Sequence, residues 1–592
     1  MATKSAREST EEGTEPKRRK IGADSVQSLV TEQELATVSG GHLREEDVAI
    51  VEWVNRQSRF SGIIKQRYSD FLVNEIAPDG RVIHLTSLAV PDEPEREEAK
   101  SLLEEESFLS EEIEQQLEET SRGERESTTI KTSNDKLKRG RIHEAIKAKF
   151  PQLESSTKDD GEEKVIYVVR ATKSNKSRRN PWPKSRGGDY CRFVLYKEYK
   201  DTADAISLMA KFINAKPTLF AFAGSKDKRA VTVQAASAYR VSAETLAKLN
   251  EKLRNIRVGN FSYSNSPLRL GELEGNRFQI ILRNVKEDTS VVDSCLASLQ
   301  DKGFINYYGM QRFGTSSVPT YEVGKALLSS RWQDAIGLIL TPLRKDEPDV
   351  AKVCSLWSDT GNASKCLKQM PKRCTIEIQL LKGIQRFGMK DAWNCLNAIP
   401  RSTRLMYVHS YQSLIWNRLV SRRLQQFQFN VLPGDLVQHK ESSSVKEISE
   451  EELPCYTIFD VVVPLPGHDV KLPQNQMEEW YNSMLKEDGF TLAGLKHRVK
   501  DYSLSGAYRK LLVKPTDVDW SHLTYDDVTV SLIETDLQKL EGSFAHRPSE
   551  GQLKAVRVNF SLPSSSYATM ALRELTKTDT SSAFQTTLNA TA

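Results

Sequence analysis

The chain has 592 residues, of which 84 are Lys or Arg and 80 are Asp or Glu, so its formal net charge is +4. This length exceeds what one hydrophobic core usually supports, and we expect two or more domains. A charge so close to neutrality does not by itself indicate a polyanionic partner, and a hydrophobic share of 38% predicts globular domains with polar tails or insertions.

The seven cysteines are scattered along the chain, and no two of them form a C-x-x-C pair. This pattern argues against a zinc site and against a disulfide framework. The polar N-terminus lacks the apolar core of a signal peptide, and no stretch is apolar enough to span a bilayer. We therefore expect a soluble intracellular protein without a metal site or a membrane partner.

Residues 1–47 are mostly polar and charged and show no clear period, which predicts a disordered tail. Within this tail the run Pro16-Lys17-Arg18-Arg19-Lys20 is of the nuclear-import type. A solvated basic patch would have the same composition, so both interpretations stay open. We expect the protein in the nucleus and in the cytoplasm.

Strands are predicted from residue 61 onward. Apolar residues recur near a period of two over 61–65 and 70–76, which indicates two short strands. Residues 77–80 read Ala-Pro-Asp-Gly and predict a turn, after which 81–85 are expected to resume the strand.

Two segments interrupt this strand-rich sequence and are interpreted as insertions. Residues 92–163 are first acidic and then mixed in charge, with parts compatible with helix, and they predict a small accessory lobe. Residues 173–188 are basic and contain prolines and one aromatic residue, Trp182.

Regular elements resume after the second insertion. Residues 191–196 predict a strand, 204–213 carry apolar residues at helical spacing, and 218–223 predict a buried strand. The sequence Gly-Ser-Lys-Asp at 224–227 follows that strand directly. A further strand is predicted over 277–283.

Asp227 stands among three cations, Lys226, Lys228 and Arg229, just after a glycine that lets the chain turn. Nearby cations keep a carboxylate ionised, as a nucleophile or a general base requires, and the same cations would hold phosphates. On these residues alone, a surface turn with a local ion pair is the alternative. A phosphate-binding P-loop is excluded because its G-x-x-x-x-G-K-[ST] pattern does not occur.

Residues 304–314 form a dense polar and aromatic segment that includes Asn306, Tyr307, Tyr308 and Arg312. An aromatic face can stack on an unstacked base, and an amide can read the edge of that base. An aromatic core corner with Arg312 paired to an acid is the alternative, and the segment alone does not decide between them.

Both segments resemble motifs of the TruD family of RNA pseudouridine synthases. Residues 224–234 match the pattern G-x-K-D-K-x-A-x-T-x-Q. Residues 306–314 match N-Y-F-G-x-Q-R-F-G, except that Tyr308 stands where the bacterial pattern has Phe. Pieces similar to G-x-x-K and D-F-x-V-x-E lie within 62–75, and further similar segments lie at 270–276 and 561–575. The long insertions resemble the eukaryotic branch of the family.

The resemblance implies an α+β fold. A pseudouridine synthase catalytic domain with a mixed antiparallel sheet would be interrupted by an inserted α/β domain, the TRUD domain. The catalytic domain would cover residues 48–303 and 516–592, and the inserted domain would cover 304–515. RNA would lie in the cleft between the two domains.

The resemblance also implies roles for individual residues. Asp227 would be the catalytic carboxylate, acting as a nucleophile at C1′ or as a base at C2′. Lys65 would hold it ionised, and Asn306 would support the Asp227 loop or the target base. Substrate binding is expected from Tyr308, which would stack on the base, and from Lys226, Arg312, Phe71 and Glu75. No metal or redox cofactor is implied.

The implied reaction is the isomerisation of uridine to pseudouridine in tRNA and, for the eukaryotic branch, in small nuclear and messenger RNA, by a monomer. The basic insertion over 173–188 would contact the RNA outside the active site. The alternative is a catalytically silent RNA-binding protein or RNA chaperone on the same fold, against which the intact Asp227 argues. A zinc nucleobase deaminase is excluded because H-x-E does not occur together with P-C-x-x-C.

Overall fold

A computed structural model of the chain describes residues 43–91, 109–132, 135–160, 163–171, 182–183, 186–314, 318–341, 347–438, 444–544 and 551–590. The basic run at 16–20 lies outside these residues, as do the rest of the tail over 1–42 and most of the basic insertion. Within the described ranges, no helix is long and apolar enough to cross a membrane.

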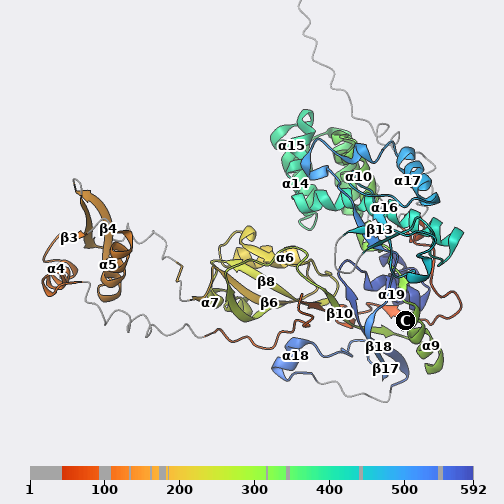
Figure 1. Cartoon of the computed structure of the whole chain (residues 1–592), viewed down its shortest axis with the longest axis horizontal. Coiled ribbons are helices and arrows are strands. Elements are labelled where there is room, and N and C mark those ends of the chain that lie inside the picture. Colours follow the sequence, from red (N-terminus) through yellow and green to blue (C-terminus); the bar gives the residue numbers. More distant parts are fainter. Residues whose placement is uncertain are drawn as a thin grey trace, which may run out of the picture.

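A nine-stranded mixed sheet organises the part of the molecule that carries the Asp227 motif (Figure 1). Its order is β17-β18-β10-β2-β8-β6-β9, with β1 paired to β10 and β7 paired to β8. Strands β2 and β8 are parallel, and the other described pairings of this sheet are antiparallel. The strands are β1 (Ile63–Ile64), β2 (Phe71–Ile76), β6 (Tyr190–Glu198), β7 (Phe220–Phe222), β8 (Val231–Tyr239), β9 (Ile256–Ser264), β10 (Gly275–Arg283), β17 (Thr516–Tyr525) and β18 (Leu553–Pro563).

Strands from the two ends of the chain meet in this sheet. Strand β10 pairs on one side with β2 and on the other side with β18, in a register that runs from Gly275 opposite Pro563 to Arg283 opposite Ala555. The chain therefore leaves the sheet after β10 and returns to it with β17 and β18. This arrangement is the α+β architecture with a mixed sheet that the sequence predicted.

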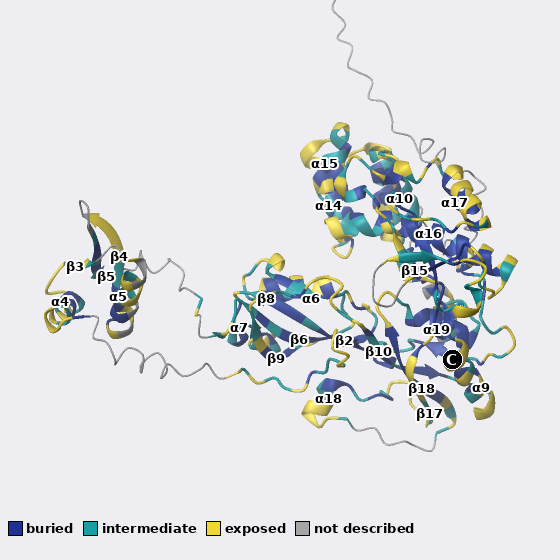
Figure 2. Ribbon diagram, in the orientation of Figure 1, coloured by how far each residue is buried: buried dark blue, intermediate teal, exposed yellow. Residues whose placement is uncertain are grey.

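Short helices cover the sheet because each has one apolar face. Helix α6 (Thr202–Phe212) begins where the Asp201 side chain accepts a hydrogen bond from the backbone N–H of Ala203 at 2.7 Å, and it buries Ile206 and Met209. These residues join α7 (Ala243–Ala247) and α8 (Leu249–Lys252) in one apolar cluster with β6, β8 and β9. In Figure 2 these strands are largely buried. The other helices of this part of the chain are α9 (Thr289–Lys302), α18 (Asp536–Glu541), α19 (Ala568–Thr576) and α20 (Ser582–Ala590).

The segment between β10 and β17 is mainly helical and contains a small sheet of its own (Figure 1). Its longest helix, α16 (Arg401–Phe427), is buried along most of its length and contacts α10, α17 and β14. The two-stranded ladder of β11 (Phe304–Ile305) and β16 (Leu512–Val513) forms where the chain enters and leaves this segment. The other elements are α10 (Thr320–Leu328), α11 (Trp332–Ile339), α12 (Pro348–Thr360), α13 (Ala363–Gln369), α14 (Thr375–Phe387), α15 (Ala392–Asn397), α17 (Gln476–Glu487) and the sheet β13-β12-β14-β15, with β12 (Leu436–Gln438), β13 (Val445–Glu447), β14 (Val461–Leu465) and β15 (Ala507–Lys510).

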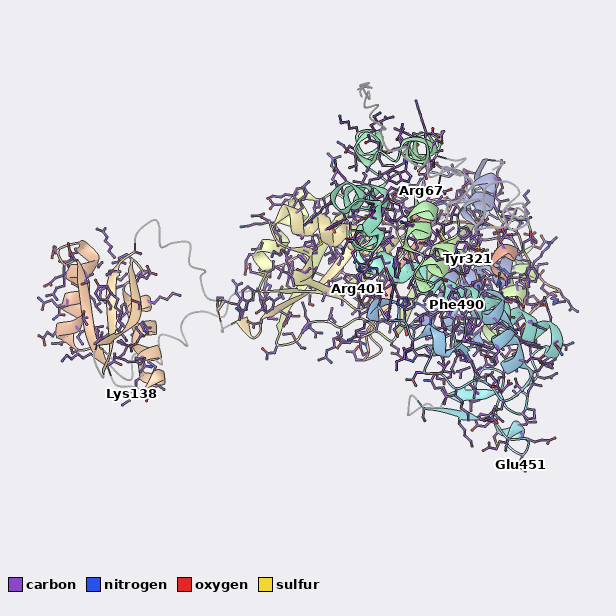
Figure 3. All side chains as sticks on the ribbon, turned by 90° about the horizontal axis from the view of Figure 1, so that it is seen from above. Arg67, Lys138, Tyr321, Arg401, Glu451 and Phe490 are labelled. Atoms are coloured by element: carbon purple, nitrogen blue, oxygen red, sulfur yellow. The ribbon has the colours of Figure 1, made fainter. Side chains whose placement is uncertain are left out.

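A small folded lobe lies within the acidic insertion and extends beyond its predicted end at residue 163, through the strand β5. A three-stranded sheet of order β3-β5-β4 packs with two helices around its own apolar cluster, which includes Leu117, Ile146 and Ile166. Figure 3 shows this lobe, which bears Lys138, standing apart from the rest of the molecule. Its elements are α4 (Glu111–Arg122), β3 (Ser127–Thr132), α5 (Lys136–Lys149), β4 (Leu153–Asp160) and β5 (Glu163–Arg170).

Two local predictions are wrong. Residues 81–85 do not resume the strand: after β2, only an isolated bridge joins Ile76 to Val82. Residues 43–47 are not part of a disordered tail. Leu43 is buried, and the buried carboxylate of Glu45 accepts a hydrogen bond from Arg573 at 2.5 Å, so this segment packs against α19.

Candidate active site at the loop after β7

The loop from Gly224 to Asp227 is fixed from below by buried side chains. The amide of Gln234 donates to the carbonyl of Gly224 at 2.8 Å. The hydroxyl of Thr202 accepts a hydrogen bond from the backbone N–H of Lys226 at 3.0 Å and donates one to the side-chain amide oxygen of Gln234 at 2.9 Å. Because Thr202 begins α6 and Gln234 lies on β8, the loop is tied to both a helix and a strand.

A fully buried lysine lies beneath the same loop. The ammonium of Lys197, on β6, donates to the backbone carbonyls of Lys200 at 2.7 Å, Lys226 at 3.3 Å and Asp227 at 3.2 Å. No sequence pattern singles out Lys197, because it directly follows the strand predicted over 191–196 and lies more than 20 positions before the motif.

The carboxylate of Asp227 is accessible and is paired with a lysine from a distant part of the chain. Its Oδ2 lies 2.8 Å from Nζ of Lys65, and the two side chains are 45% and 13% exposed, respectively. The Lys65 ammonium holds the pKa of Asp227 below its ordinary value, although burial raises it, and Lys197 and Lys226 lower it further. The predicted proximity of Lys65 and Asp227 is observed, and the carboxylate is ionised at neutral pH.

Lys65 is held in one place by its backbone and by Phe71. Its φ is 55°, a left-handed conformation that is uncommon for a residue with a side chain. Its ammonium lies 3.8 Å from the centre of the Phe71 ring, where the ring quadrupole attracts a cation. Phe71 itself is buried and packs against Phe278. Phe71 therefore contacts Lys65 in this structure and presents no open face to a substrate.

Lys226 and Glu75 form a buried ion pair, so the expectation that Lys226 holds RNA phosphates is not supported. Nζ of Lys226 lies 2.6 Å from Oε2 of Glu75, and both side chains are almost fully buried. The other oxygen of Glu75 accepts from the backbone N–H of Ala235 at 3.1 Å. Of the three cations around Asp227, Lys228 is exposed and Arg229 is half-buried, and these two remain available to a polyanion.

Asn306 does not contact the Asp227 loop. Its side-chain oxygen accepts from Arg509 at 2.8 Å, and its side-chain N–H donates to the carbonyl of Lys510 at 3.1 Å. Arg509 also donates to the carbonyls of Asn306 at 2.8 Å and Ser565 at 2.6 Å. Asn306 therefore fixes a buried guanidinium that links β15 to the chain just before α19. No hydrogen bond to the Asp227 loop is seen, and support of the target base by Asn306 stays a prediction.

Tyr308 is buried under two guanidinium groups. Its ring centre lies 4.1 Å from Cζ of Arg509 and 5.5 Å from Cζ of Arg312, and its edges contact Trp416 and Tyr567. Only 8% of Tyr308 is exposed, so its stacking on a base stays a prediction that requires movement of its neighbours. Arg312 has no carboxylate partner among the described residues, and its Nε lacks a hydrogen bond there. In the described residues Tyr308 thus lies in a buried aromatic corner, as that alternative expects, but no acid pairs with Arg312.

Arg509 and Tyr567 are also residues that the sequence analysis did not single out. Tyr567 lies within the segment at 561–575 that resembles the family, but nothing in the sequence shows that it and Arg509 would meet at Tyr308.

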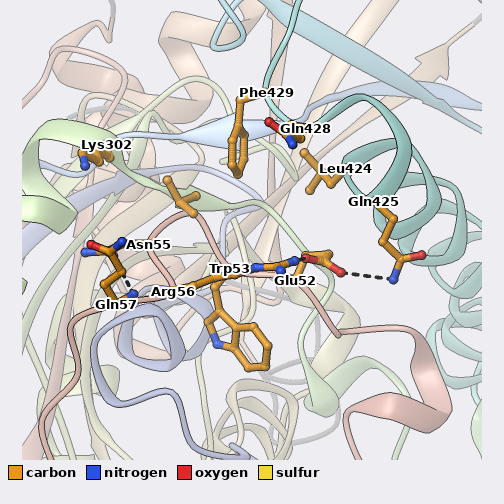
Figure 4. Close-up of a pocket in the computed structure, with 11 residues that line it drawn as sticks. Glu52, Trp53, Asn55, Arg56, Gln57, Lys302, Leu424, Gln425, Gln428 and Phe429 are labelled. Atoms are coloured by element: carbon orange, nitrogen blue, oxygen red, sulfur yellow. Dashed lines mark hydrogen bonds and ion pairs between the residues drawn. The ribbon is translucent and has the colours of Figure 1, made fainter.

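A separate cavity of about 470 Å³ lies away from the Asp227 loop (Figure 4). It is formed by residues 52–57, Lys302 and the end of α16 with the two residues that follow it, including the half-buried Trp53 and the exposed Phe429. None of the residues of the Asp227 network lines it. The catalytic candidate is thus defined by its hydrogen-bonded loop and not by this cavity.

The family model described as tRNA pseudouridine synthase D (TruD) matches residues 165–575. The chain belongs to the TruD family of pseudouridine synthases. It is 45% identical over 559 residues to the pseudouridylate synthase 7 homolog of Mus musculus, covering 92% of this chain and 83% of the relative. It is 35% identical over 627 residues to the multisubstrate pseudouridine synthase 7 of Schizosaccharomyces pombe, covering 92% of both chains.

The fold is also that of a solved member of this family. The putative tRNA pseudouridine synthase D of Methanosarcina mazei matches with a TM-score of 0.52 over 90% of this chain and 97% of that chain, at 21% sequence identity. As a TruD-family protein of the branch that includes the pseudouridine synthases 7, this chain is an RNA pseudouridine synthase, which is an isomerase.

Proposed function

We propose that Asp227 is the carboxylate that performs the isomerisation. The observation that supports this role is its accessible, ionised side chain, paired with Lys65 at 2.8 Å on a loop fixed by buried groups. Placing a charged group on a rigid loop removes much of the reorganisation that a reaction would otherwise require.

The reaction must break the C1′–N1 bond of uridine, turn the uracil and join its C5 to C1′. Asp227 either attacks C1′ and forms a covalent sugar ester, or removes a proton from C2′ and leaves a glycal. Both routes place a carboxylate beside a sugar that develops positive charge, as in glycoside hydrolysis. In both, C5 loses its proton after it bonds to C1′, and N1 carries a proton in the product. In the first route the new bond displaces the Asp227 carboxylate from C1′, and in the second route the proton taken by Asp227 returns to C2′, so the atoms balance.

The substrates that we propose are tRNA and, in addition, small nuclear and messenger RNA, bound by a monomer. The names of similar proteins support this breadth, since the matching family is called tRNA pseudouridine synthase D and one relative is called a multisubstrate pseudouridine synthase. The target base must leave its stack to reach Asp227. Lys228 and Arg229 lie beside Asp227 and would meet the phosphates. We also propose residence in the nucleus and the cytoplasm, based on the basic run at 16–20.

The substitution Asp227→Asn tests the catalytic role. It keeps the size of the side chain but removes its charge, so the fold and RNA binding persist while pseudouridine formation is abolished. The measurement is pseudouridine formed in tRNA from cells that lack this enzyme, together with the affinity of the variant for the same tRNA. Asp204→Asn, at an exposed position of α6, is the matched control. Parental conversion by folded Asp227→Asn protein would remove Asp227 from the mechanism and revive the silent RNA-binding alternative.

A further inference from the structure

Lys197 is an unusual residue to find buried near the end of a strand, between β8 and β9. Its side chain is fully buried, and its ammonium donates hydrogen bonds to three backbone carbonyls, those of Lys200, Lys226 and Asp227. No carboxylate in the described part of the chain is hydrogen-bonded to it. Two of its three acceptors belong to the loop that presents the proposed catalytic carboxylate.

A buried ammonium is costly, because its desolvation is only partly offset by hydrogen bonds to neutral groups. A Met side chain of similar length would fill the same space without that cost. The buried charge therefore lowers the stability of the folded protein. In return, its hydrogen bonds fix the positions of the backbone carbonyls of Lys226 and Asp227.

The charge of Lys197 also acts on Asp227 itself. Burial disfavours the charged form of Lys197. Of the charged groups that face it, Asp201 and Asp227 stabilise the ammonium and Lys226 destabilises it. The interaction with Asp227 is reciprocal, since Lys197 is one of the lysines that lower the pKa of that carboxyl. Burial lowers the pKa of Lys197 itself to about 8.

We propose that Lys197 is a positioning residue for the isomerisation, whose ammonium fixes the backbone of Asp227 from beneath and keeps the carboxylate aimed and ionised. This inference rests on the proposed catalytic role of Asp227. It has a consequence for pH: once the ammonium loses a proton, it retains two donors for three carbonyls, so the loop loosens and the rate falls on the alkaline side.

The experiment compares Lys197→Met, Lys197→Arg and the control Lys211→Met, which removes an exposed lysine from α6. Single-turnover rates with tRNA from cells lacking this enzyme are measured between about pH 6 and pH 10, a range that brackets the titration of a buried lysine. Circular dichroism and tRNA affinity are measured in parallel. Lys197→Met is expected to bind tRNA normally but to react on the order of 10–100-fold more slowly, as for a small misplacement of a catalytic group.

Lys197→Arg keeps the positive charge at every pH in this range, so its rate is expected to lose the alkaline decline that the parent shows. Because Lys197→Arg keeps a cationic hydrogen-bond donor at the buried position, its pH profile tests the proposal even if Lys197→Met is unstable. A parental rate and pH profile in Lys197→Met, or an unchanged alkaline decline in folded Lys197→Arg, would overturn the proposal. Failure of the proposed function would look different, because Asp227→Asn would then retain activity.

Discussion

Lys65 and Asp227 are 162 positions apart in the sequence, and their contact sets the electrostatics of the site. The ammonium stabilises the anionic form of Asp227, while burial works against it. Removing the ammonium therefore allows the pKa of the carboxyl to rise, and the carboxylate becomes protonated at a higher pH.

We therefore predict that Lys65→Met moves the acidic limb of the rate profile to higher pH. The ionised carboxylate is the active form, so the rate declines as pH falls through its pKa, and this decline begins earlier without Lys65. Single-turnover rates at saturating tRNA between about pH 4 and pH 7 measure the limb, a range that brackets the carboxyl titration. Lys228→Met, which removes an exposed cation from the same loop, should leave the limb in place. If the acidic limb of Lys65→Met lies at the same pH as that of the parent, the ion pair does not set the pKa of the reacting carboxylate.

Tyr308 leads to a second prediction. Tyr308→Phe keeps the ring beneath Arg509, so stability and activity should stay close to those of the parent. Tyr308→Ala leaves a cavity among Trp416, Tyr567 and Arg509, and should lower the free energy of unfolding by about 3–5 kcal/mol, as for other buried aromatic truncations. Urea unfolding measures the stability and tRNA conversion the activity. If Tyr308→Ala is as stable as the parent but inactive, the ring acts on the substrate rather than in the core.

The sequence motifs indicated the pairing of Lys65 with Asp227, but they did not indicate which neighbouring side chains are buried. The spacing of Lys226 and Lys228 around Asp227 looks symmetrical, yet one is buried and the other exposed. Burial of Lys226 depends on Glu75, which is 151 positions away and is not implied by any local pattern. Side-chain environments of this kind are set by tertiary packing, which residue spacing alone does not report.

At the scale of elements, the parallel pairing of β2 and β8 assembles the site. It places Leu72 opposite Val231 and Asn74 opposite Val233, so the side chain of Glu75 reaches both Ala235 and Lys226. The sequence predicted β2 and the strand before the motif from their apolar patterns. It did not predict which strands would be neighbours, because hydrophobic alternation sets the face of a strand and not its partner.

The buried pair between β2 and the loop gives the third prediction. Glu75→Gln leaves the Lys226 ammonium buried without a charged partner, and the free energy of unfolding should fall by about 3–5 kcal/mol. Urea denaturation provides the measurement. Asp189→Asn, which breaks an exposed pair with Arg240, should cost less than about 1 kcal/mol. Equal losses in the two variants would mean that the Glu75–Lys226 pair is not desolvated as the structure shows.

At the scale of the molecule, one hydrophobic core joins the two ends of the chain to the helical segment between them. It includes Phe71 and Phe278 of the sheet, Leu572 of α19 and Trp416 of α16. The resemblance implies the return of the chain to the sheet, because it assigns residues 516–592 to the catalytic domain. The shared core was not predictable, because apolar residues on α16 give no indication of the helix or strand against which they pack.

The lobe over 109–171 contrasts with this shared core, because its apolar residues cluster among themselves. We predict that replacing residues 93–172 by a flexible Gly/Ser linker leaves the thermal unfolding midpoint of the remaining protein unchanged. Pseudouridine formation in a short RNA should also persist, because Asp227, Lys65 and Lys197 take no contacts from the lobe in the described structure. A matched truncation within α9, which packs against α19, should instead abolish folding. A large fall in the unfolding midpoint of the linker variant would show that the lobe is an integral part of the catalytic body and not an insertion.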